Sequence, residues 1–68
     1  MRTFSLFTTD SRYSVPTLTL VIVEDEEQAI ERAEANLRES NYHRAVELRD
    51  DGRSVYRRSR AEERGLLN

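Results

Sequence analysis

The chain contains one histidine, His43, the side chain best suited to acid–base chemistry near neutral pH. Ser40 and Asp50 lie near it in the sequence. A catalytic triad is defined by the geometry of its members, which nearness in the sequence does not show. No hydrolase nucleophile motif, phosphate-binding loop or dinucleotide-binding loop occurs. We therefore interpret His43 as an exposed residue at a helix-to-strand junction and predict no enzymatic activity and no catalytic residue.

The segment Asp-Ser-Arg-Tyr-Ser at positions 10–14 groups an acid, two hydroxyls, an arginine and an aromatic ring. Arg12 and Tyr13 could together hold an anion or a base, although Asp and Ser are also ordinary turn-forming residues. A small-ligand site here is an alternative function. It requires Arg12, Tyr13 and His43 to converge on one pocket.

A second group of polar residues follows Tyr56, where the sequence reads Tyr-Arg-Arg-Ser-Arg. Arginines can contact phosphates and an aromatic ring can stack on a base, so nucleic-acid binding is a further alternative. The candidate contacts are Arg53, Arg57, Arg58 and Arg60. The net charge of −2, and a segment 24–39 with seven acids and two arginines, disfavour this alternative. Arginines that protect a strand edge explain the run equally well.

The composition excludes several ways of stabilising a small domain. The 68-residue chain has no cysteine and one histidine, so we predict no disulfide, no metal site and no cofactor. A domain of this size buries little core, which favours association with a second chain. All eleven basic residues are arginine, as is common in GC-rich bacterial genomes. Because no apolar run is long enough to span a membrane or to form a signal peptide, we expect a cytoplasmic protein.

The hydrophobic pattern predicts an α+β fold with the element order ββαββ. Alternation predicts strands over 3–8, 17–23, 44–49 and 53–58, and Asp51-Gly52 is a strong hairpin signal. A helix is expected to begin after Asp25 as N-cap, with Gln28 in the capping-box position, and to end near Ser40. We predict one domain over 1–58, built as a mainly antiparallel sheet in order 2-1-3-4 with the helix on one face. Residues 59–68 are expected to form a polar, flexible tail.

The strand at 17–23 stops alternating at Val21-Ile22-Val23, so both of its faces are apolar there. We expect Leu18, Leu20 and Ile22 to face the helix together with Val55. The open face would then carry four exposed apolar residues: Phe7, Val21, Val23 and Tyr56. A second copy of the chain, another protein, or the tail through Leu66 and Leu67 could cover this face, or it could stay bare. We hypothesise a non-catalytic interaction domain that forms a homodimer through these residues.

Overall fold

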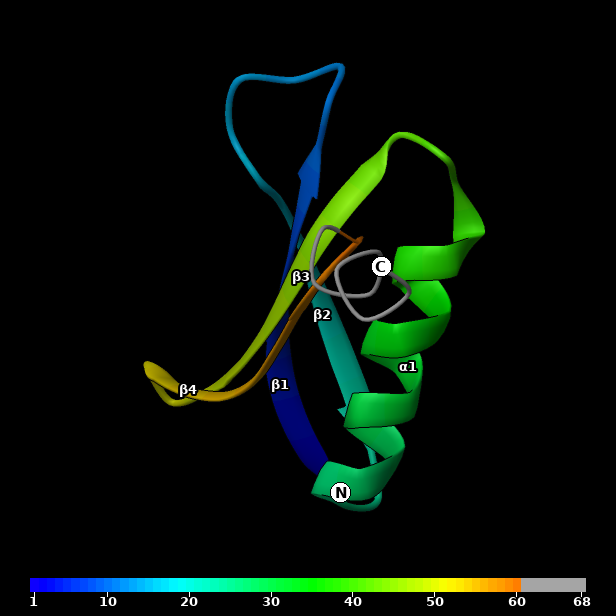
Figure 1. Ribbon diagram of the computed structural model, residues 1–68. Coiled ribbons are helices and arrows are strands. Elements are labelled where there is room, and N and C mark those ends of the chain that lie inside the picture. The colour runs from blue at the N-terminus through cyan, green and yellow to red at the C-terminus, as the bar shows by residue number, and fades with distance from the viewer. Residues whose placement is uncertain (61–68) are drawn as a thin grey trace.

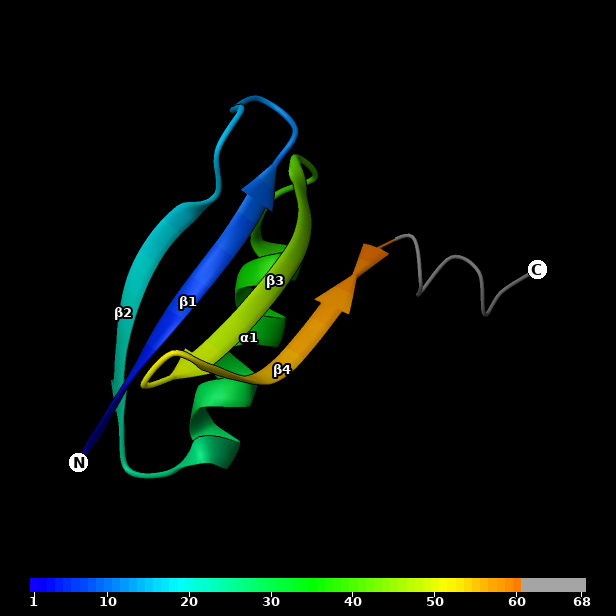
Figure 2. The same ribbon diagram turned by 90° about the vertical axis from the view of Figure 1, so that its left-hand side faces the viewer.

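The computed structural model describes residues 1–60 and confirms the predicted two-layer α+β fold. The elements are β1 (Arg2–Asp10), β2 (Thr17–Val23), α1 (Glu26–Glu39), β3 (His43–Asp50) and β4 (Arg53–Ser59). The four strands form one antiparallel sheet in the order β2-β1-β3-β4, with α1 on one face (Figure 1). The strand order is the predicted one. It makes β2 and β4 the two edges of the sheet (Figure 2).

The helix begins where the sequence predicts. The Asp25 carboxylate accepts a hydrogen bond from the Gln28 backbone N–H, and the Gln28 side chain accepts one from the backbone N–H of Glu24. These bonds satisfy N–H groups that have no partner within the helix. Ala29, Ala33 and Leu37 form the buried stripe, and the two alanines let the helix lie close to the sheet. The last helical residue is followed by Ser40 as C-cap.

The placement of the β2 side chains corrects the prediction. Val21 and Val23 are only 5% and 4% exposed and lie beneath the helix, whereas Leu18, Leu20 and Ile22 lie on the open face. The cause is the pairing of β2 with β1, in which Phe4 is opposite Val21. Residues directly opposite each other share a face, so burial of Phe4 buries Val21 as well. The predicted placement of Val21 and Val23 on the open face, as interface residues, is therefore wrong.

Tyr56 also lies on the opposite face from the predicted one. The Asp51-Gly52 turn has the predicted positive φ angles, 51° and 81°, and pairs Arg49 with Ser54. Beyond this pair the register shifts, so that Leu48 is opposite Tyr56 and Val55 is an extra residue. Tyr56 consequently packs against the core on the helix side and is not an open-face residue. Phe7 keeps its predicted place on the open face, between Leu18 and Glu47.

The folded domain extends two residues beyond the predicted boundary at 58. β4 runs through Ser59, and the Arg60 guanidinium donates hydrogen bonds to three backbone carbonyls, those of Leu37, Ser40 and His43. The first two of these carbonyls belong to the end of α1, which leaves its last carbonyls without partners inside the helix. Ser59 and Arg60 are therefore part of the fold. The predicted flexibility of the tail, and the suggestion that Leu66 and Leu67 cover the open face, concern residues outside the described range.

Within residues 1–60, α1 is too short and too polar to cross a membrane.

Candidate functional site

The open face of the sheet carries a row of exposed aliphatic side chains on β2, which we call the apolar row: Leu18, Leu20 and Ile22. They are 56%, 63% and 57% exposed. Side chains at alternate positions of a strand point to the same side, so the three lie in a line along the edge of the sheet. Phe7 on β1 is opposite Leu18 and extends the row inward. Exposed apolar residues that are contiguous mark interaction sites more often than scattered ones do.

The other half of the open face is polar. Glu47 and Arg49 of β3 form an ion pair of 3.3 Å, and the Arg49 guanidinium lies 5.4 Å from the centre of the Phe7 ring. Hydrogen bonding from Ser54, followed by that from Arg49, holds the pKa of Glu47 below its usual value, so this residue is ionised at neutral pH. Arg57 of β4 is opposite Glu47. A hollow of about 290 Å³ with Phe7, Glu47, Arg49 and Arg57 in its lining lies here.

A second candidate site lies at the end of β1, around the buried carboxylate of Asp10. Arg12 gives this carboxylate three hydrogen bonds: from its backbone N–H (2.8 Å), from Nε (3.1 Å) and from Nη2 (2.8 Å). The Arg12 side chain thereby lowers the pKa of Asp10 to about 2 against the opposing effect of burial, and the pKa of Arg12 is raised in turn. The Arg12 guanidinium also lies 4.4 Å from the ring centre of Tyr42 and 5.4 Å from that of Tyr13.

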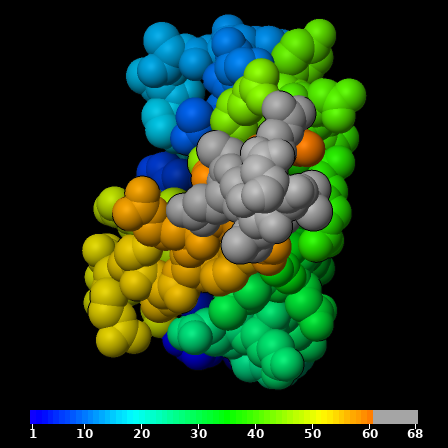
Figure 3. All heavy atoms as spheres, viewed as in Figure 1, coloured from blue at the N-terminus to red at the C-terminus, as the bar shows by residue number. Residues whose placement is uncertain are grey.

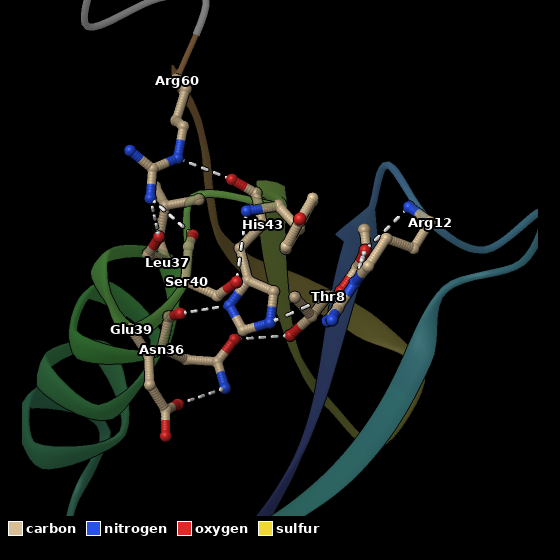
Figure 4. Close-up of polar contacts among 10 residues, drawn as sticks. Thr8, Arg12, Asn36, Leu37, Glu39, Ser40, His43 and Arg60 are labelled. Carbon is tan, nitrogen blue, oxygen red and sulfur yellow. Dashed lines mark hydrogen bonds and ion pairs between the residues drawn. The ribbon is translucent and has the colours of Figure 1, made fainter.

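His43 belongs to the same cluster, which Figure 4 shows in close-up. Its Nδ1 is 2.6 Å from the backbone carbonyl oxygen of Asn36 and must carry a proton to donate to it, while Nε2 is 3.7 Å from Asp10 Oδ2. A register shift after Thr9 places His43, rather than Arg44, opposite Asp10. Bulges of this kind redirect side chains near functional sites. The acid beside His43 is thus Asp10, and not the Asp50 considered from the sequence.

The three residues of the ligand hypothesis do converge. Arg12, Tyr13 and His43 line one pocket of about 490 Å³ together with Asp10, which we call the loop pocket. Its remaining walls are hydroxyl-bearing and apolar residues and one amide: Thr8, Val15, Pro16, Thr17, Thr19 and Asn36. The pocket can offer hydrogen bonds to a small neutral molecule. Arg12 is already paired with Asp10, which weakens its attraction for an anion.

The sequence pattern does not identify Asn36 and Thr8 as members of this site. The Thr8 hydroxyl donates to Asn36 Oδ1 at 2.7 Å, and this bond ties β1 to the last turn of α1 (Figure 4). Nothing in the pattern around either residue signals this contact. Asp10 belongs to the candidate segment 10–14, where Asp is an ordinary turn-forming residue, and its carboxylate accepts a hydrogen bond from the N–H two residues on.

The four arginines proposed for nucleic-acid binding do not form one surface. Arg58 donates to Glu34 of the helix at 3.0 Å, and Arg60 is bonded to the carbonyls around the end of α1. Figure 3 shows the surface where β4 and α1 lie side by side. Arg57 is opposite Glu47, which faces away from the helix, and Arg53 is next to the hairpin turn. Two of the four arginines therefore help to attach β4 to the helix. Nucleic-acid binding stays a prediction, and these four arginines do not supply the continuous basic surface that it would use.

Comparison with known proteins found no family model that matches the chain, and no similar curated protein or solved structure. Among residues 1–60, no three His, Asp or Glu side chains gather as a protein metal site would require.

Proposed function

We propose that the chain is a non-catalytic cytoplasmic interaction module that forms a homodimer through the apolar row of β2. The observation that carries this proposal is the exposure of Leu18, Leu20 and Ile22, each more than half accessible and all on one side of one edge strand. Leu18, Leu20 and Ile22 take the place of the expected Val21, Val23 and Tyr56, and the proposed surface of association is still the open face.

The size of the domain makes this exposure energetically important. Complete burial of a leucine or isoleucine side chain is worth about 1.5–3 kcal/mol, so covering three that are half exposed would gain about 2–4 kcal/mol per protomer. The core of so small a domain supplies roughly 3–5 kcal/mol. The free energy gained by burying the apolar row would therefore be comparable with the free energy that the core supplies to the fold.

The test is the oligomeric state measured by sedimentation equilibrium from low to high micromolar concentration. We expect a dimer. Leu20→Glu should raise the dissociation constant of this dimer by roughly a hundredfold or more, because two charges would be buried at the interface. Asn41→Glu is the matched control, since it adds the same charge at an exposed turn away from β2. Circular dichroism checks that both variants fold. A wild-type chain that stays monomeric at high micromolar concentration would contradict the proposal.

The loop pocket supports a second candidate function, the binding of a small neutral hydroxylic molecule. The supporting observation is that Arg12, Tyr13 and His43 line the same cavity, which also contains several hydroxyl groups. Glucose and inorganic phosphate are suitable probes of opposite chemistry. We expect glucose to shift the NMR signals of His43 and Thr17 in a saturable way and phosphate to leave them unchanged. Saturation by phosphate, or by neither probe, would contradict this candidate.

A further inference from the structure

The backbone edge of β2 points to how two copies would meet. β2 pairs with β1 along all seven of its residues, and within residues 1–60 no other strand pairs with its outer side. The N–H and C=O groups on that side are available to a further strand. The helix does not block them, because α1 packs mainly on β3 (Figure 2). A groove of about 590 Å³ lies between α1 and β2, with Leu20 and Val21 in its lining.

Within its own seven residues, β2 lacks the charges, prolines and bulges that commonly prevent edge pairing. Its sequence, Thr-Leu-Thr-Leu-Val-Ile-Val, contains no charged residue and no proline, and its register with β1 is unbroken. Natural sheets commonly protect their edges with charges, prolines or bulges. The opposite edge, β4, has three arginines and a register shift. Of the two edges of the sheet, β4 therefore carries features that disfavour pairing with a further strand, and β2 does not carry them within its sequence.

The order of residues along β2 is suited to a second copy of the same strand. We propose, on the basis of the homodimer proposed above, that two β2 strands pair antiparallel about Leu20 and join the two sheets into one of eight strands. In this register Leu20 is opposite its own copy, and Leu18 is opposite Ile22 of the partner. Every pair in the apolar row is then aliphatic on both sides.

The helix-side face of β2 fits the same register. Val21 becomes opposite Thr19 of the partner, and Val23 becomes opposite Thr17 of the partner. All of these side chains are β-branched, the class that packs best across neighbouring strands. If the centre shifted by one residue to Thr19, Leu18 would be opposite Leu20 and Ile22 would have no partner in the row. If it shifted to Val21, Ile22 would be opposite Leu20 and Leu18 would have none. Leu20 is therefore the centre that uses the whole row.

Single cysteines can test this register cleanly because the chain has none of its own. Residues directly opposite each other have Cβ atoms about 4.5–5.5 Å apart, within reach of a disulfide after small adjustments. We expect Leu20→Cys to form a disulfide-linked dimer under mild oxidation at least about tenfold faster than Leu18→Cys. In the second variant the two cysteines would be four residues apart along the strands, about 13 Å. The double variant Leu18→Cys/Ile22→Cys should restore rapid cross-linking.

Hydrogen exchange distinguishes edge pairing from packing of one open face on another. Edge pairing should slow exchange at alternate β2 amides, those directed away from β1, by at least about tenfold at dimeric compared with monomeric concentration. Face-to-face packing would leave these amides unprotected. A dimer with unprotected β2 amides and equal cross-linking at positions 18 and 20 would overturn the edge-pairing proposal but keep the homodimer. A monomer at all concentrations would overturn both.

Discussion

The two edge strands of this sheet are held in place by different forces. β4 is attached through polar contacts: Tyr56 and Arg58 both donate to Glu34 of the helix, and Arg60 bonds the carbonyls around the end of α1. β2 contributes Val21 and Val23 to the core and keeps an uncharged outer edge. Hydrogen bonds to fixed partners define the position of a strand. Exposed apolar surface lowers the free energy when another surface covers it. The comparison indicates that β4 closes the domain and that β2 is the edge available for association.

The two faces of β2 offer the largest test of this difference. Val21→Asp places a carboxylate in the core without a partner and should cost at least about 3 kcal/mol, enough to unfold most of the protein. Leu20→Asp adds the same group on the open face and should change the stability of the monomer by less than about 1 kcal/mol. Urea denaturation below the dimerisation concentration measures both. Equal losses would show that the open face is also packed within the monomer.

The error in predicting β2 has an identifiable physical source. Alternation identifies the buried face of a strand only when one face is polar, and at Val21-Ile22-Val23 both faces are apolar. The prediction placed Leu18, Leu20 and Ile22 on the helix side. The choice is made by the register with β1, where Phe4 is opposite Val21. A long-range pairing of this kind is set by the loop between the strands as well as by composition, and no local pattern encodes it.

Other parts of the fold were predictable because their signals are local. The Asp25 cap and the Asp51-Gly52 turn depend on side chains and φ angles within a few residues, and both were predicted correctly. The register shifts near Thr9 and Leu48 were not predictable in the same way. A bulge adds one residue without a distinctive composition, yet it decides that His43 meets Asp10 and that Tyr56 meets the helix. The corrections at His43 and Tyr56 therefore trace to backbone irregularity.

The polar attachment of β4 predicts the next largest effect. Arg60→Ala removes hydrogen bonds to three carbonyls, of 2.6, 2.6 and 2.8 Å, and should destabilise the protein by about 1–3 kcal/mol. Because these carbonyls are uncharged, the loss should change little between low and high salt. Arg57→Ala is the matched control, an exposed arginine of β4 three residues earlier, with an expected change of less than about 0.5 kcal/mol. Similar losses for both variants in urea denaturation would contradict the role of Arg60.

The loop that leads into β2 should respond to acid. The pKa of Asp10 is lowered to about 2 in the folded chain from an ordinary value of 3.8, so the unfolded chain binds a proton first as the pH falls. The stabilisation from Asp10 is then complete above about pH 5 and is lost progressively toward about pH 1. The difference in unfolding free energy between wild type and Asp10→Asn should shrink over this range. Since the pKa of Glu47 is also lowered, the variant isolates the part due to Asp10. A constant difference would contradict the pairing with Arg12.

The smallest expected effect concerns a single hydroxyl at the β4 edge. The Tyr56 hydroxyl donates to Glu34 Oε2 at 3.0 Å, and the same oxygen accepts a hydrogen bond from Arg58. Tyr56→Phe should therefore cost about 0.5–1.5 kcal/mol, because Glu34 keeps a charged partner. A double-mutant cycle with Glu34→Ala should give a coupling energy of similar size. Tyr42→Phe removes a hydroxyl from a half-exposed ring as the control. Zero coupling would mean that the Tyr56 hydroxyl does not help to hold β4, and the contrast between the two edges would then rest on Arg58 and Arg60.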